Sequence, residues 1–519
     1  MLKFIFIFLI ILSCTKKEIQ NGEIDESKES LKILFTGNIN GELEPCGCRQ
    51  FPLGGINHLH GLIKGLSKSS NIIFVDTGDT FFKQNFKIQD ENKSQLFRAK
   101  NLSTALSMVG LNLKVLGDQD FSYGEKNLAE IIQNQKFSIL GTNIKSNLIK
   151  TLPLKEYKFH KHRIFFLGVS DNEITQIRDR NHEVKFMDTI DSIKSQIIEL
   201  KKLGFDDKNK FHHLILLSHS GMSTDKKIAA QIKELDWILG SHSQNFTQKP
   251  ITVGKTKILQ MLSRNHYIGD IELKKNSPEI VFTYHEVNQS LAEKVKDNPL
   301  TSFVDEFQKE LNKIQDEEQK RRPSIVTETK TGRLPTASSC MDCHDDQGSF
   351  WQETAHSIAY KTLLDNHSNN NLDCLKCHSL GLKEKGGFNN VKDMVITSEG
   401  PVGENYWKEV FSKKHPKLAI REWDKQKIKD LSEHWYYTDL KFKVDHNYSN
   451  VQCLNCHEHV PNHSEGNVPY KSDPLKIKGK CLVCHNSDQS SHWYSESGQL
   501  LEKKFNEALD QVKCPKTEE

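Results

Sequence analysis

The sequence has little imbalance of charge, few aromatic residues and no low-complexity tract. Its 71 basic and 68 acidic residues leave a formal net charge of +3, which offers no electrostatic footprint for nucleic acid. Hydrophobic residues make up 36% and aromatic residues 8% of the 519 residues, and no segment after the first few residues is apolar for long enough to span a bilayer. These absences exclude a polytopic membrane protein. The length predicts about two to four domains.

The first residues have the pattern of a targeting segment. Lys3 precedes an apolar run from Phe4 to Leu12, which is too short for a transmembrane helix but suits a signal-peptide core. The run ends Ile-Leu-Ser-Cys14, which resembles the cleavage box of bacterial lipoproteins. The resemblance implies that Cys14 becomes the lipidated first residue of an exported chain. An ordinary secretory signal would also export it, and residues 15–30 would form a flexible tether.

Four Cys-x-x-Cys-His motifs lie in the last third of the chain. They are Cys340, Cys343 and His344; Cys374, Cys377 and His378; Cys453, Cys456 and His457; and Cys481, Cys484 and His485. Two thiols at this spacing reach the two vinyl groups on one edge of a porphyrin, and the next imidazole then binds the iron axially. Paired cysteines also hold zinc, but zinc needs no histidine directly after every pair. The motifs predict four covalently attached c-type haems.

Further histidines in this region can supply the second axial ligand of each iron. Beyond the four in the motifs, they are His356, His367, His415, His434, His446, His459, His463 and His492. Iron with two imidazole ligands carries electrons, whereas iron with an open position can bind a small substrate, and the sequence leaves both possibilities open. Because the region has few long apolar runs, porphyrin faces would supply much of its core. We expect it to be largely unfolded without haem.

The C-terminal region resembles the tetrahaem cytochromes c that take electrons from hydroxylamine oxidoreductase. Residues 351–359, WQETAHSIA, match that group's Trp-x-x-Ser/Thr-x-His-x-x-Ala helix, and His463 lies six residues after His457, where the family has a distal histidine. The resemblance implies that His356 and His463 are distal ligands. The family's Gly-Pro-Gly after the third motif is missing, and the absence of a Cys-x-x-Cys-Lys motif argues against a haem of the nitrite-reductase type.

The first half of the chain alternates short apolar runs, polar turns and helical patterns. The apolar runs are 33–36, 72–75, 114–116, 214–217 and 237–239. This alternation predicts an α/β domain whose sheets are covered by helices. Polar residues follow the runs, at the carboxyl ends of the expected strands, where such folds place their sites.

These polar residues resemble the metallophosphoesterases of the UDP-sugar hydrolase/5′-nucleotidase type over roughly residues 29–290. That family holds two divalent ions close together, and the ions clamp and polarise a phosphoryl group. The resemblance implies a layered α/β sandwich. The metal ligands that it implies here are Asp79, Asp118, His219 and His242.

Amide side chains stand at the family's other ligand positions. Asn38 replaces a carboxylate, and Asn40 and Gln244 replace imidazoles, although neutral amides are poor ligands for such metals. Gln119 replaces the histidine that acts on the leaving group, and an amide cannot transfer protons near pH 7. We therefore expect a scaffold that binds metal weakly or at one position only, without hydrolysis.

Three cysteines belong to neither the signal nor the haem motifs: Cys46, Cys48 and Cys514. The Cys-Gly-Cys pair follows the first expected strand, near Asn38 and Asn40. A close thiol pair can be a redox couple or a soft ligand set for another metal. A disulfide within the loop, or to Cys514, is the alternative.

The whole chain is therefore predicted to have five parts. They are a lipoprotein signal (1–14), a tether (15–30), a degenerate metallophosphoesterase-like α/β domain (31–290), a connecting helix and linker (291–334), and a mainly α, loop-rich tetrahaem cytochrome c domain (335–519). The predicted function is electron transfer in the periplasm by a membrane-anchored lipoprotein with redox protein partners and no nucleic acid. The alternatives are a metal-dependent phosphoester hydrolase with accessory haems, and haem-based turnover of a small nitrogen compound.

Overall fold

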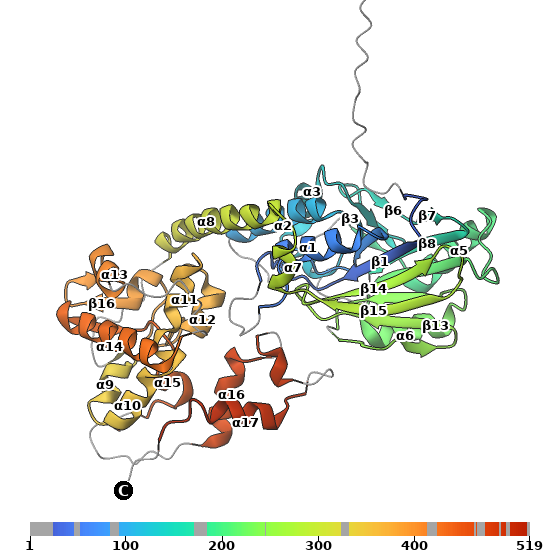
Figure 1. The fold of residues 1–519 in the computed structure, drawn as a ribbon. Coiled ribbons are helices and arrows are strands. Elements are labelled where there is room, and N and C mark those ends of the chain that lie inside the picture. The colour runs from blue at the N-terminus through green and yellow to red at the C-terminus, as the bar shows by residue number, and fades with distance from the viewer. Residues whose placement is uncertain are drawn as a thin grey trace, which may run out of the picture.

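The computed structural model describes residues 24–45, 52–83, 93–170, 184–243, 245–322, 332–412, 423–460, 463, 473–486, 489–494 and 499–515. A layered α/β domain is joined by the long helix α8 (Pro299–Lys320) to a mainly helical C-terminal domain (Figure 1). The α/β and helical classes predicted for the two regions are confirmed. The predicted roles of Cys14, Cys46, Cys48 and Gln244 concern positions outside the described residues.

Two twisted sheets form the N-terminal domain. The first has seven strands in the order β15 (Ile280–Glu286), β14 (Tyr267–Lys274), β1 (Ser30–Thr36), β2 (Asn71–Asp76), β3 (Leu111–Lys114), β4 (Ser138–Leu140) and β6 (Thr151–Leu152). The second has six in the order β12 (Ile251–Val253), β13 (Thr256–Gln260), β11 (Trp237–Gly240), β10 (His212–His219), β8 (His162–Ser170) and β7 (Lys155–Phe159). The strands β1 to β4 run parallel, as do β8, β10, β11 and β13.

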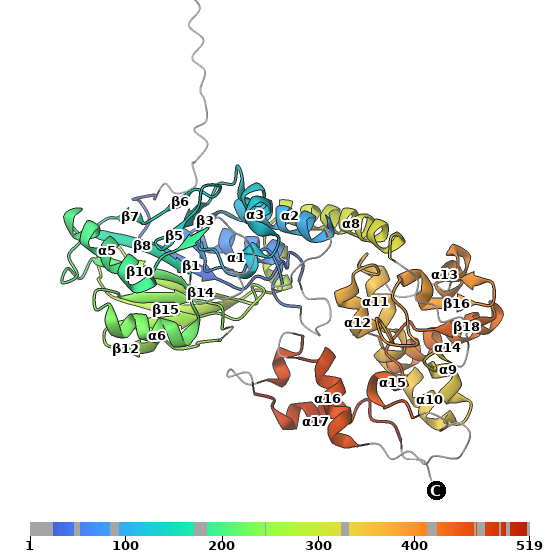
Figure 2. The ribbon, with the colours of Figure 1, turned by 180° about the vertical axis from the view of Figure 1, so that it is seen from behind.

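Alternating side chains on the central strands explain why the two sheets pack face to face. In β10, Ile215 and Leu217 enter the core between the sheets, while Leu214 and Leu216 face the helices on the other side. In β2, Ile73 and Val75 likewise face the second sheet. Strands with apolar residues on both faces must be covered on both faces. The result is a sandwich of four layers, with helices outside each sheet (Figure 2).

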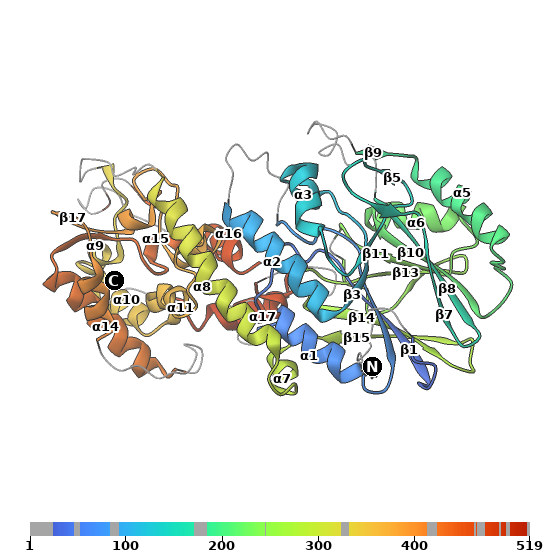
Figure 3. The same ribbon diagram turned by 90° about the horizontal axis from the view of Figure 1, so that it is seen from above.

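Helices cover the outer face of each sheet. Those over the first sheet are α1 (Ile56–Leu66), α2 (Lys93–Val109) and α3 (Gly124–Ile132), and those over the second are α5 (Thr189–Lys202) and α6 (Gly221–Gln231). The two-stranded sheet of β5 (Ile144–Lys145) and β9 (Lys185–Phe186) lies apart, and α7 (Gln289–Glu293) contacts α1. Helix α8 buries Leu300, Val304, Phe307 and Leu311 in the core of the first sheet, beside α2 (Figure 3).

Strand β3 differs from the apolar run predicted at 114–116. It covers Leu111–Lys114, so the run begins where the strand ends. The backbone N–H of Val115 still donates to the carbonyl oxygen of Asp76, at 2.9 Å, before the chain turns at Gly117. The run therefore marks the segment that leaves the sheet toward the site, because these residues stay buried after the ladder has ended.

The C-terminal domain is built from short helices and one small sheet. Its helices are α9 (Ala337–Met341), α10 (Asp345–Gln352), α11 (Ala359–Asp365), α12 (Leu372–His378), α13 (Glu404–Val410), α14 (Lys425–Lys441), α15 (Cys453–Cys456), α16 (Pro474–Cys484) and α17 (Glu502–Leu509). The sheet has the order β17 (Gly400–Pro401), β16 (Val395–Thr397) and β18 (Val444–Asn447). The core of this domain includes aromatic residues of α13 and α14, among them Tyr406 and Trp435. Across the described ranges, no helix has both the length and the apolar character needed to cross a bilayer.

Candidate metal centre and haem-binding region

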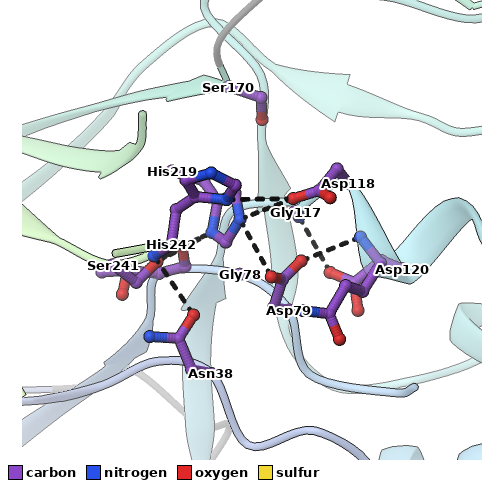
Figure 4. Close-up of polar contacts among 12 residues, drawn as sticks. Asn38, Gly78, Asp79, Gly117, Asp118, Asp120, Ser170, His219, Ser241 and His242 are labelled. Carbon is purple, nitrogen blue, oxygen red and sulfur yellow. Dashed lines mark hydrogen bonds and ion pairs between the residues drawn. The ribbon is translucent and has the colours of Figure 1, made fainter. Parts of the chain in front are cut away.

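The four predicted metal ligands meet at one edge of the two sheets. Asp79 follows β2, Asp118 follows β3, His219 is the last residue of β10, and His242 lies just beyond β11. Because the parallel strands of both sheets end at this edge, residues from distant parts of the chain converge there (Figure 4).

The spacing of the four side chains suits a single cation. One ligand atom from each of Asp79, Asp118, His219 and His242 lies within 4.8 Å of all the others. His219 Nε2 is 3.2 Å from Asp79 Oδ2 and 3.2 Å from Asp118 Oδ1, and His242 Nδ1 is 3.2 Å from the same Asp118 oxygen. Two carboxylates and two imidazoles form a donor set that divalent first-row metals accept. The residues therefore fit a bound divalent ion.

The backbone at this edge turns sharply to present the side chains. Asn38, Asn40, Asp79 and His242 all have positive φ, between 51° and 73°, which is uncommon for residues other than glycine. Such conformations cost roughly 1–3 kcal/mol each and persist where the surrounding structure holds them. Gly117 has no room for a side chain, which would collide with Asp79 and His219. The positive φ of Asp79 and His242 and the close approach of Gly117 to Asp79 and His219 thus involve three of the four ligands.

Burial and mutual charge shift the pKa values of the ligands. Burial raises the pKa of Asp79, although the nearby His219 opposes the shift. Burial would lower the pKa of His219, but the Asp79 and Asp118 carboxylates outweigh it and raise that pKa well above its usual value. In the absence of a cation, a proton on His219 therefore bridges the two carboxylates. A divalent ion would take the place of that proton.

The substituted amides lie beside the centre. Asn38 is fully buried, and its Oδ1 accepts a hydrogen bond from the backbone N–H of His242 at 3.1 Å. Its Nδ2, like Oδ1 of the buried Asn40, has no hydrogen-bond partner among the residues that the structure describes. The backbone N–H of Gln119 donates to Asp79 Oδ1 at 2.9 Å, so Gln119 orients the ligand through its main chain. The side chains of Asn38, Asn40 and Gln119 are neutral amides, which do not transfer protons near pH 7.

A buried ion cluster that the sequence did not predict supports the loops of the centre. The fully buried Lys114 Nζ lies 3.0 Å from Asp76 Oδ1 and 3.0 Å from Asp120 Oδ2, and it also contacts Thr80 Oγ1. Asp120 accepts hydrogen bonds from the backbone N–H groups of Thr80, Phe81 and Gly117. The cluster fixes the two loops that carry Asp79 and Asp118. The one available signal was a lysine inside an apolar run.

In the C-terminal domain, cysteines of different motifs lie in side-chain contact. Cys340 of the first motif contacts Cys453 of the third. The third motif's Cys456 contacts Cys481 of the fourth. The fourth motif's Cys484 contacts Cys377 of the second. The four motifs, which span 146 positions from 340 to 485, therefore form one continuous series in the order first, third, fourth, second.

The two predicted distal histidines each face a motif histidine. The ring centres of His344 and His463 are 6.2 Å apart, with 11° between the ring planes. The ring centres of His356 and His485 are also 6.2 Å apart, with 63° between the planes. Because a metal–imidazole bond is about 2 Å long, two imidazoles on opposite faces of one iron have ring centres roughly 6 Å apart. Both pairs therefore have the separation that an iron between them requires.

The surroundings of these histidines favour the neutral imidazole that binds metal. Burial lowers the pKa of His356 and lowers that of His485 to about 4. Burial also lowers the pKa of His378, and its Nδ1 lies 2.7 Å from the carbonyl oxygen of Ala359. An Nδ1–H that donates to a carbonyl leaves the lone pair on Nε2, which is the tautomer of most metal-bound histidines.

The other histidines of this region take less uniform positions. His434 Nε2 lies 2.8 Å from the carbonyl oxygen of Glu409, and His446 Nδ1 lies 3.3 Å from Arg333 Nη1. His367 and His459 are exposed. His415 lies outside the described residues, so no partner is assigned to it.

Comparisons with known proteins find different relatives for the two regions of the chain. A family described as "Cytochrome c554 and c-prime" matches residues 339–399, which contain the first two motifs. The predicted cytochrome resemblance is confirmed for that part.

The N-terminal region is similar to 5′-nucleotidases. The mouse enzyme is 26% identical over 234 residues, covering 42% of this chain and 38% of its own length; the human enzyme is 24% identical over the same shares. The chain thus spans well under half the length of these relatives. A 5′-nucleotidase precursor from Thermus thermophilus has a TM-score of 0.46 and 14% identity, covering 79% of this chain and 97% of that one.

Proposed function

We propose that this protein is an exported, lipid-anchored cytochrome that carries electrons on four c-type haems. In this proposal its N-terminal domain is a 5′-nucleotidase-like scaffold that binds one divalent cation and serves for docking or sensing. The protein would face the periplasm, held by the lipidated Cys14, and would meet redox proteins as partners. The observation that carries the proposal is the contiguous series of four Cys-x-x-Cys-His motifs. In addition, the ring centres of His356 and His463 each lie 6.2 Å from the ring centre of a motif histidine.

The proposed haem ligands follow from the contacts already described. The motif cysteines would form the thioethers and the motif histidines the proximal ligands. His463 would be the distal ligand opposite His344, and His356 the distal ligand opposite His485. When bound, each haem iron takes up and releases one electron. The protein's part is to bury His356 and His485, which lowers their pKa values and keeps both imidazoles neutral.

The charges of the N-terminal centre support a scaffold over a hydrolase. Asp79 and Asp118 carry two negative charges, which one divalent ion neutralises. A neutral centre attracts a phosphate group less than a centre with two ions and the same number of carboxylates. The amides of Asn38, Asn40 and Gln119 supply neither a second metal site nor a proton at neutral pH.

Haem and metal content test the proposal directly. The purified holoprotein should contain four haems per chain by pyridine haemochrome and bind one Mn²⁺ by equilibrium dialysis, with the binding lost in Asp79→Ala. His356→Ala and His463→Ala should each convert one haem from low to high spin, whereas His367→Ala, a change at an exposed histidine, should convert none. A colourless protein from a host able to attach haem, or stoichiometric zinc in place of haem, would contradict the proposal.

A phosphoester hydrolase with accessory haems is the second candidate. The four-ligand centre and the 5′-nucleotidase relatives favour it. Hydrolysis of a nucleotide or a phosphodiester in the presence of Mn²⁺, abolished by Asp79→Ala but retained after bleaching of the haems, would establish it. No turnover above the Asp79→Ala background is expected.

A further inference from the structure

The C-terminal end of helix α8 is hydrogen-bonded to both domains. Glu318 Oε1 accepts a hydrogen bond from the backbone N–H of Ser94, at 2.8 Å, in the first turn of α2. At the end of α8, Asn390 Nδ2 of the C-terminal domain donates to the carbonyl oxygen of Gln319 at 2.8 Å and to that of Arg322 at 3.2 Å. The terminal carbonyls of a helix need such partners. The C-terminal domain therefore caps a helix whose other end lies in the N-terminal core.

The second haem-binding motif lies against the N-terminal domain at this junction. Asp373, which precedes Cys374, places its Oδ2 3.7 Å from Lys83 Nζ of the N-terminal domain. The charges of Glu42 and Arg98, also of the N-terminal domain, act on the Cys374 side chain. The contacts between the cysteines put the second motif at one end of the series and the first motif at the other. The end that faces the N-terminal domain is thus the second motif.

A short buried segment leads from this contact to the metal centre. Lys83 lies four residues after Asp79, and the residues between them, Thr80, Phe81 and Phe82, are almost fully buried. Asp120 of the buried ion cluster holds the backbone of Thr80 and Phe81. The segment is therefore a fixed and buried spacer. A charge at its Asp79 end is poorly screened by solvent on the way to its Lys83 end.

We propose that the N-terminal metal centre acts on the haem series at the second motif. A divalent cation bound at Asp79, Asp118, His219 and His242 raises the reduction potential of the haem attached at Cys374 and Cys377. The potentials of the other three haems rise less. This inference rests on the proposed function, since it needs both the cation and the haems. The cause is electrostatic, because a reduced haem carries one positive charge fewer and is stabilised by a nearby cation.

Linkage makes the effect measurable from both sides. If the cation favours the reduced haem, then reduction must tighten cation binding by the same factor. Coupling at the lower end of the usual range is about fivefold. For a one-electron couple this factor equals a rise of about 40 mV, at 59 mV per tenfold change. The N-terminal domain would in this way report metal availability to the electron carrier.

The test is a spectroelectrochemical titration of the holoprotein with and without saturating Mn²⁺. One of the four haem components should move to higher potential by the stated amount, and Asp79→Asn should remove the shift. His378→Met labels the second haem by its own change of potential and spectrum, and His344→Met is the matched label at the other end of the series. The haem component whose potential responds to Mn²⁺ should be the same component whose potential His378→Met changes. His344→Met should leave the potential of that component unchanged. Each variant should retain four haems.

A second measurement needs no variant at the haem. In the wild-type protein, bound Mn²⁺ should broaden the methyl proton signals of one haem at the lowest occupancy, before those of the other three. Equal movement of all four components, or a shift confined to the component labelled by His344→Met, would overturn the inference. Mn²⁺ bound, as seen by its EPR signal, without any shift would overturn it and leave the proposed function intact. Absence of Mn²⁺ binding would remove the metal centre from the proposed function, and the inference with it.

Discussion

The two domains hold themselves together by different means. In the N-terminal domain, three clusters of buried apolar residues fill the layers around and between two sheets. In the C-terminal domain, one cluster covers residues 358–448, and Phe505 is the only buried apolar side chain among the described residues after 452. Leu475 and Val483 on α16 are 78% and 63% exposed. The first domain has an extensive apolar core of its own, whereas the described residues of the third and fourth motifs bury almost no apolar side chain.

Removal of the haems should have the largest effect, because it should unfold part of the C-terminal domain and leave the N-terminal domain folded. A variant with all eight motif cysteines replaced by serine should lose the structure of residues 453–515, because no protein core replaces the porphyrin faces there. Limited proteolysis followed by mass spectrometry should show rapid cleavage after residue 452 and a resistant N-terminal domain.

The matched control for haem loss is replacement of the exposed, non-motif Cys514 by serine, which should leave the pattern of the wild type. Equal protease resistance of both halves in the haem-free protein would mean that the polypeptide alone folds the C-terminal domain.

A cavity in the core between the two sheets should destabilise the N-terminal domain and leave the C-terminal domain unchanged. Phe166 on β8 is fully buried and packs edge-on against Tyr157 at 5.9 Å between ring centroids. Phe166→Ala should lower the free energy of unfolding of the N-terminal domain by about 3–5 kcal/mol. Differential scanning calorimetry should show the change in the N-terminal transition, with the haem absorption lost at the same temperature as in the wild type.

Leu203→Ala tests the same domain at an exposed apolar position, with 59% of the side chain accessible. It should change the N-terminal transition by less than about 0.5 kcal/mol. A joint shift of both transitions in Phe166→Ala would instead show that the two domains unfold as one unit.

A buried carboxyl group should give the C-terminal core a pH dependence. Burial raises the pKa of Asp439 to about 6, and its oxygens accept hydrogen bonds from Tyr406 Oη and Asn447 Nδ2. Because the folded state binds this proton more tightly than the unfolded state, stability should fall as pH rises from about 4 to 6 and stay lower above that, by at most about 3 kcal/mol. Urea unfolding followed by Soret absorption measures the slope.

Asp439→Asn should remove the dependence of stability on pH between about 4 and 6, since an amide does not titrate in this range. Asp430→Asn on the exposed side of the same helix is the matched control and should keep it. A slope that survives in Asp439→Asn would assign the pH dependence to other groups, such as the haem ligands.

Removal of the Asn390 side chain, which caps the C-terminal end of α8, should have the smallest effect on stability. Asn390→Ala removes two hydrogen bonds to the end of α8, and loss of such bonds costs about 0.5–1.5 kcal/mol each. Hydrogen exchange should quicken in the last turn of α8, with little change in its first turn. Lys313→Ala, at an exposed position of α8, should leave both ends unchanged, and equal exchange in the two variants would show that Asn390 contributes nothing to the junction.

The amino-acid sequence by itself determined the local chemistry. The Cys-x-x-Cys-His motifs and the candidate metal ligands Asp79, Asp118, His219 and His242 could be predicted because each carries its signal within a few residues, at the end of a strand or within a motif. The apolar runs placed most central strands for the same reason. The run at 114–116 was displaced from β3 because burial continues after the ladder ends.

Only the tertiary structure decided which of these residues meet. That His463 faces His344, that His356 faces His485, and that the second motif adjoins the N-terminal domain depend on contacts between residues far apart in the chain. The ion pairs of Lys114 with Asp76 and Asp120 likewise depend on how separate elements pack together. Periodicity and spacing encode neighbours along one strand or helix, whereas these pairings arise from how whole elements pack, which is decided by the summed burial of many side chains.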